Sequence, residues 1–122
     1  GMKKMRWSIV FLSVMTFLVS TVFLSYAADL SGTWNVKVEI SGTTGTPVFI
    51  LKEEGDKFVG TYKSQWGEFS CEGTVKGNDF EIVADVGGNK FVYKGKLDGD
   101  KMSGEANLGG QASGPFTGER EK

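Results

Sequence analysis

The octapeptide GDKFVGTY, residues 55–62, opens with a phrase that the chain repeats. Weaker copies begin at Gly77 (GNDFEI) and at Gly99 (GDKMSG), so that the three copies start 22 residues apart. Glycine next to Asp or Asn is typical of tight turns between strands, because these residues tolerate the backbone angles that such turns require. A turn that recurs at a fixed spacing indicates an array of one supersecondary unit.

Short runs of alternating apolar and polar residues lie between these turns. The clearest are TWNVKVEIS (33–41), FEIVADV (80–86) and FVYKGKL (91–97). Alternation with a period of two is expected of a strand that buries one face of a sheet and exposes the other. A second glycine signal stands near the middle of each unit, so each unit is predicted to be a hairpin.

We therefore predict an all-β fold, an eight-stranded antiparallel up-and-down barrel built from four hairpins of about 22 residues. Closure into a barrel buries the shared apolar face and leaves no free edge strand. A two-sheet sandwich is the alternative, but it usually needs longer crossing connections than this chain offers.

The first 27 residues differ in composition from the rest. Gly1, interpreted as a cloning remnant, is followed by the basic segment KKMR (3–6) and by an apolar run over residues 7–24. The sequence Ser25-Tyr26-Ala27 then offers small residues at the two positions that a signal peptidase recognises. These features predict a cleavable secretory signal peptide. An uncleaved anchor is the alternative, because the apolar run is nearly long enough to span a bilayer.

The remainder, residues 28–122, is predicted to be one domain that is secreted or located in the bacterial periplasm. The leader holds three of the 14 basic residues and none of the 15 acidic ones, which leaves a net charge of about −4. An acidic domain with scattered basic residues is not expected to bind nucleic acid or, after cleavage, a membrane. Cys71 is alone, so we expect a buried thiol or, if it is exposed, an intermolecular disulfide.

The predicted strand PVFILK (47–52) could point either of its two alternating sets of side chains into the barrel. The spacing in the later units places Phe49 and Leu51 inside the barrel, and Val48 and Ile50 outside beside Val59. Three apolar residues on adjacent strands could be ordinary surface or a contact between copies of the chain. An interaction module that binds no ligand and assembles through this outer strip is therefore one candidate function.

The sequence Gly32-Thr33-Trp34 on the first strand, together with Arg120 on the last, resembles the signature of the calycin barrels, which include lipocalins and avidins. The stretch GDKFVGTYKSQWG (55–67) is similar to the third strand and following loop of avidin-type proteins. In these barrels the Trp closes one end and the Arg stacks across it, which implies a contact between Trp34 and Arg120. A guanidinium over an indole contributes roughly 0.5–2 kcal/mol.

The resemblance also implies that Tyr62 and Ser64 match a Tyr and a Ser that hold the polar head of biotin in avidin-like proteins. However, the first strand carries Val36, Val38 and Ile40 where avidins place a polar ligand-binding side chain. The two Trp residues of the domain are also too few for the aromatic box around biotin. Biotin is therefore not the expected ligand.

The end of the barrel opposite the Gly–acid turns is the predicted binding end, ringed by loop 41–46 and by glycine turns. The side chains of Tyr62, Ser64 and Tyr93 are expected to point inward near this mouth, with Trp66 in its rim. An apolar cavity with a few convergent hydroxyl groups is a reasonable site for a small, mostly apolar molecule. Side chains alone also fill many eight-stranded barrels, so a filled interior remains the alternative.

The chain offers little catalytic machinery. It has no His, and the alternation sends the carboxylates outward, so neither a general base nor a metal ligand set is expected inside the barrel. The acidic pair Asp98 and Asp100 belongs to a tight turn rather than to a calcium loop. We therefore predict a protein that is not an enzyme and that has no cofactor and no metal site.

Overall fold

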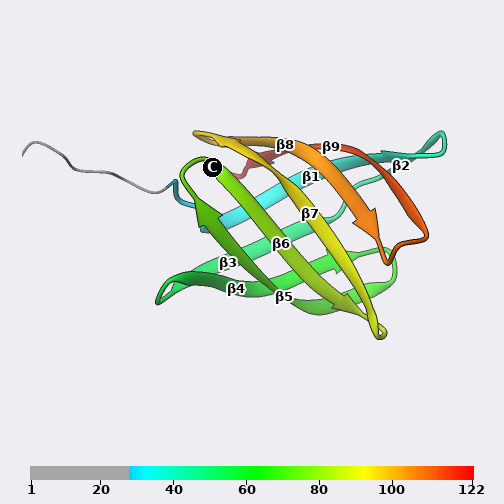
Figure 1. Ribbon diagram of the computed structural model, residues 1–122, viewed down its shortest axis with the longest axis horizontal. Helices are drawn as coiled ribbons and strands as arrows, with labels where there is room; N and C mark the ends of the chain where they lie inside the picture. The colour runs from blue at the N-terminus through cyan, green and yellow to red at the C-terminus, as the bar shows by residue number, and fades with distance from the viewer. Residues whose placement is uncertain (1–27) are drawn as a thin grey trace, which may run out of the picture.

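The computed structural model describes residues 28–122 (Figure 1). The predicted signal peptide, residues 1–27, lies outside the described residues. Within the described part, the chain contains no helix that is long and apolar enough to cross a membrane. Its strands are β1 (Gly32–Ile40), β2 (Thr43–Gly45), β3 (Val48–Glu54), β4 (Lys57–Ser64), β5 (Gly67–Lys76), β6 (Asp79–Val86), β7 (Asn89–Asp98), β8 (Lys101–Leu108) and β9 (Ala112–Arg120).

The sheet closes on itself. Each strand from β3 to β8 pairs antiparallel with the next strand in the sequence, and β1 pairs with both β3 and β9. The strands cross the barrel obliquely, with the turns gathered at its two ends (Figure 1). The predicted all-β, eight-stranded meander barrel is therefore confirmed, with β2 as one additional strand.

Strand β2 corrects the prediction of a simple loop over residues 41–46. β2 and β3 pair with β1 in one continuous register, so they are two pieces of a single strand. Pro47 separates the pieces because proline has no N–H to donate to the ladder, although its carbonyl still accepts the N–H of Val36 at 3.0 Å. A two-residue turn at Ser41 and Gly42, both with positive φ, joins β1 to β2.

The inward face agrees with the predicted alternation. Phe49 and Leu51 are buried, whereas Ile50 is 38% exposed on the outer face. Cys71 is buried as expected, and burial raises the pKa of its thiol to about 12. The thiol is therefore a small apolar group of the core.

Aromatic rings fill the middle of the barrel. The ring of Phe49 lies 5.1 Å from that of Tyr62 and 5.0 Å from that of Tyr93, measured between centroids. The ring of Phe116 lies 5.1 Å from Tyr93 and 6.1 Å from Phe80. Edge-on and tilted contacts of this kind stabilise a packed core. The sequence did not decide whether side chains fill the interior. In the structure they fill the middle of the barrel.

One end of the barrel is closed by Trp34 and Arg120. The guanidinium carbon of Arg120 lies 4.3 Å from the centre of the Trp34 ring, so the predicted contact is present. Arg120 also donates hydrogen bonds to the carbonyls of Ser31, Asp29 and Gly99 and, at 2.8 Å, to the carboxylate of its neighbour Asp100. These bonds tie the last strand to the segment that precedes the first.

Leu30 completes this closure, and the sequence analysis did not identify it. Its side chain is fully buried, and its carbonyl accepts the indole N–H of Trp34 at 2.9 Å. It precedes β1 and has no place in the strand alternation, so the period-two pattern could not assign it to the core.

Candidate ligand-binding pocket

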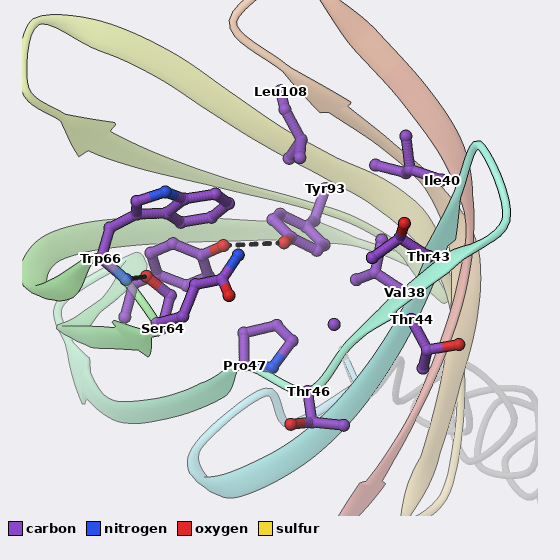
Figure 2. Close-up of a pocket in the computed structure, with 13 residues that line it drawn as sticks. Val38, Ile40, Thr43, Thr44, Thr46, Pro47, Ser64, Trp66, Tyr93 and Leu108 are labelled. Carbon is purple, nitrogen blue, oxygen red and sulfur yellow. Dashed lines mark hydrogen bonds between the residues drawn. The ribbon is translucent and has the colours of Figure 1, made fainter.

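The opposite end of the barrel contains a pocket with a volume of about 320 Å³. Its walls come from the β1–β2 hairpin, the segment that leads into β3, the end of β4 with the β4–β5 turn, the middle of β7 and the end of β8 (Figure 2). The lining residues are Val38, Ile40, Thr43, Thr44, Gly45, Thr46, Pro47, Tyr62, Ser64, Gln65, Trp66, Tyr93 and Leu108. All four residues predicted to lie at the mouth, Tyr62, Ser64, Trp66 and Tyr93, are among them.

Two phenols contribute to the inner part of the pocket. The hydroxyl groups of Tyr62 on β4 and Tyr93 on β7 lie 3.0 Å apart and share a hydrogen bond, drawn as a dashed line in Figure 2. Each residue is only 1% exposed. Burial raises the pKa of both phenols, and the neighbouring Tyr62 raises that of Tyr93 further. Both groups therefore stay protonated at neutral pH and act as hydrogen-bonding groups rather than as bases.

Trp66 forms part of the rim. Its side chain is 55% exposed, and its ring meets the ring of Phe91 edge-on with 5.8 Å between centroids. Its backbone N–H donates to Oγ of Ser64 at 3.1 Å. The Ser64 hydroxyl therefore holds the β4–β5 turn in shape while it faces the pocket, and it retains its own proton for a further hydrogen bond.

The wall made by the β1–β2 hairpin is the part of the site that sequence reasoning missed. It presents the side chains of Val38, Ile40 and Thr43 to the opening, whereas Thr44 pairs with the outward-facing Glu39 and its side chain points away (Figure 2). The segment TTGTP was treated as a mouth loop, so its residues were not assigned to the site. The β-branched threonines just before Pro47 are the signal that could have indicated an interrupted strand.

A second hollow of about 350 Å³ adjoins the first at the same end of the barrel. Its lining includes Val86 and Phe91, and it shares Trp66 and Leu108 with the first pocket. These two shared side chains therefore stand between the hollows.

None of the thirteen residues that line the first pocket is charged. Charged side chains instead pair on the outer face of the barrel, as in the ladder that Asp79 and Lys96 (2.6 Å) and Glu81 and Lys94 (3.7 Å) form between β6 and β7. Within residues 28–122, no group of three or more His, Cys, Asp or Glu side chains is placed to hold a metal ion.

The predicted outer strip is interrupted by polar neighbours. Ile50 stands between Thr33 on β1 and Thr61 on β4, while Val48 and Val59 are only partly exposed. Ile50 and Trp66 are the large hydrophobic side chains that are exposed within the described part of the chain. The strip therefore offers one prominent apolar side chain rather than a continuous apolar surface.

No protein-family model and no curated protein matches this sequence. Among solved structures, the chain is similar to a Schistosoma mansoni fatty acid binding protein in complex with arachidonic acid, at 16% identity and a TM-score of 0.48, over 75% of this chain and 96% of that one. It is also similar to human cRBP IV, at 17% identity and a TM-score of 0.46, over 77% and 99% of the two chains.

The chain has a calycin-like barrel fold. This follows from its own closed eight-stranded meander and from the contact of Trp34 on β1 with Arg120 on β9. A shared barrel does not by itself identify a ligand, because such folds host many unrelated functions.

Proposed function

We propose that this protein is a non-enzymatic binding protein that holds a small, mostly apolar molecule in the pocket at the open end of its barrel. The observation that carries the proposal is the pocket itself, in which apolar and aromatic walls surround a hydrogen-bonded pair of buried hydroxyl groups. Its volume of about 320 Å³ lies at the lower end of the range for small-molecule sites.

The chemistry of the lining favours binding over catalysis. A nucleophile or a general base must be activated by a neighbouring base or by a shifted pKa near neutrality. The chain has no His, and burial moves the pKa of both Tyr62 and Tyr93 away from neutrality. The lining groups can therefore orient and hold a molecule, but they offer no activated group to transform it.

We further propose that the protein acts outside the cytoplasm, after removal of residues 1–27. The domain that would remain supports this boundary, because its first residues contact the barrel. The backbone N–H of Ala28 donates to the carbonyl of Gly77 at 3.3 Å, and Leu30 is fully buried against the closed end. Mass spectrometry of the protein purified from its natural host would show a mature chain that starts at Ala28.

Titration with N-phenyl-1-naphthylamine tests the binding function. This uncharged dye becomes strongly fluorescent when it leaves water, so binding in the pocket is expected to produce a saturable rise in emission with one site per chain. A charge in the apolar wall should oppose binding. Ile40→Glu, which places a carboxylate in the pocket, is expected to weaken dye binding at least tenfold.

Ile50→Glu is the matched control, because Ile50 lies on the outer face of β3. This variant should bind the dye as the wild type does. Equal binding by the Ile40 variant, or no saturable binding by the wild type, would exclude the proposed site. The same control tests the predicted contact between copies through Val48, Ile50 and Val59, because loss of an assembly in the variant would appear as a lower mass in light scattering.

A further inference from the structure

We propose that the pocket selects an uncharged, ring-bearing molecule that presents an oxygen acceptor, such as a ketone or amide carbonyl, and that it rejects carboxylates. This inference rests on the proposed function, since it specifies the class of ligand that the same pocket holds. It is carried by the hydroxyl pair, the neutral lining and the aromatic rim.

The hydroxyl pair carries two protons, but only one of them takes part in the hydrogen bond between the two groups. In the bond between Tyr62 and Tyr93, one hydroxyl donates and the other accepts. Because each phenol carries one proton, the accepting hydroxyl retains an O–H that points to neither partner. Within residues 28–122, no other hydrogen bond to either hydroxyl is present, and both residues are 1% exposed.

A buried O–H without an acceptor is unfavourable. A ligand whose oxygen reaches this O–H should therefore bind more tightly than a ligand without an acceptor. Both phenols line the pocket, and their hydroxyl groups face one another across the dashed line in Figure 2. A carbonyl oxygen on the inner end of a ligand can accept this proton. A hydrocarbon of the same shape would instead leave the O–H unpaired.

A carboxylate has no compensating partner in this pocket. None of the lining residues is cationic, and the ion pairs between β6 and β7 lie on the outer face of the barrel. Transfer of an ion from water into an apolar site is costly unless an opposite charge meets it. The lining contains no anionic side chain either, so it offers no counter-ion for an amine.

The aromatic lining and small volume of the pocket favour a flat ring system. Trp66 and Tyr93 contribute aromatic surfaces, and Trp66 is braced edge-on by Phe91. Aromatic surfaces prefer tilted or offset contacts with other rings. The small volume suits a molecule of one or two fused rings better than a long acyl chain.

Three naphthalenes of nearly the same shape test the inference by displacement of N-phenyl-1-naphthylamine. These are 2-acetylnaphthalene, with a carbonyl acceptor, 2-ethylnaphthalene, with none, and 2-naphthoate, with a charge. We expect the ketone to bind about tenfold more tightly than the ethyl compound, as one recovered hydrogen bond implies. The naphthoate should bind at least tenfold more weakly than the ethyl compound.

The double variant Tyr62→Phe/Tyr93→Phe removes both hydroxyl groups and keeps both rings. It should lose the preference for the ketone, so that it binds 2-acetylnaphthalene and 2-ethylnaphthalene with equal affinity. Both substitutions are needed, because either phenol left alone could still donate to a ligand. An independent readout is the carbonyl stretch of bound 2-acetylnaphthalene in the wild type, which a hydrogen bond from a phenol shifts to lower frequency.

The outcomes separate this inference from the function on which it rests. Equal affinity for the ketone and the ethyl compound, or preferred binding of the naphthoate, would overturn the inference while the pocket remained a binding site. An unshifted carbonyl stretch would also overturn it. If neither the dye nor any of the naphthalenes binds, the proposed function fails as well.

Discussion

Arg120 shows how one side chain can connect the two ends of a closed sheet. It covers the ring of Trp34 and donates hydrogen bonds to three carbonyl groups and to Asp100, and it is 20% exposed. A planar guanidinium can make these bonds at once, whereas an ammonium cannot. The sequence predicted the contact with Trp34, but it could not show that the same group also binds the segment before β1.

Arg120→Lys is therefore expected to lower the free energy of unfolding by about 2–3 kcal/mol, because it leaves several acceptors unpaired. The measurement is urea denaturation followed by circular dichroism. Lys37→Ala, on the exposed outer face of β1, is the control and should change stability by no more than about 0.5 kcal/mol. Equal midpoints for the Arg120 variant and the wild type would show that the closure does not depend on this residue.

The buried phenols lead to a prediction about alkaline pH. Tyr62 and Tyr93 are the tyrosines of residues 28–122, and burial raises the pKa of both above the value of about 10 for an unfolded chain. Above pH 10 the unfolded chain therefore loses protons that the native protein keeps, and stability falls as pH rises. Burial raises the pKa of the Cys71 thiol to about 12, so this group also lowers stability as pH rises, beginning about one pH unit lower.

Ultraviolet absorbance of tyrosinate and circular dichroism should accordingly change together as a protein of residues 28–122 is titrated above pH 10. The phenols should ionise only as the barrel unfolds. Tyrosinate that forms near pH 10 while the circular dichroism stays native would show that the pair is accessible to water, and would contradict the buried floor of the pocket.

Among the single elements, the β1–β2 hairpin differs most from what the sequence pattern predicted. The wall that it contributes comes from a strand broken by Pro47, and its tip places Ser41 at a φ of 52°. Non-glycine residues rarely adopt this region, and Asn tolerates it better than Ser. The sequence Asn-Gly is the preferred pair for a two-residue turn of this kind.

Ser41→Asn is therefore expected to raise the free energy of unfolding by roughly 0.5 kcal/mol, because it relieves an unfavourable backbone angle. Thermal and urea denaturation would measure the gain. Ser70→Asn, on an exposed face in the middle of β5, tests whether Asn is stabilising by itself and should give no gain. A Ser41 variant no more stable than the wild type would indicate that the turn is not strained.

For the whole molecule, closure depends on places where neighbouring strands have no room for a side chain. Gly95 on β7 stands directly opposite Gly104 on β8. A Cβ on Gly95 would lie 1.9 Å from the carbonyl oxygen of Ser103, and one on Gly104 would lie 1.9 Å from that of Lys94. Because backbone atoms cannot move aside without breaking the ladder, these glycines allow the tight coiling of the sheet.

Gly95→Ala is accordingly expected to destabilise the barrel by about 3 kcal/mol or more, the upper range for overpacking. The matched control is Gly45→Ala, since a Cβ on Gly45 meets no atom within 4 Å. The control should fold with nearly unchanged stability in the same urea titration. Similar midpoints for the two variants would mean that the barrel can open or shift at β7 and β8 without cost.

The sequence alone was sufficient to predict the number of barrel strands, the alternation of inward residues and the four aromatic and hydroxyl residues near the mouth. It could do so because a period-two pattern and evenly spaced turns are local properties of the chain. The tertiary structure alone decided the rest: Leu30 under the closed end, β2 as a wall of the pocket, and the hydrogen bond between Tyr62 and Tyr93. These features depend on distances between residues far apart in the sequence, which arise only when the sheet closes.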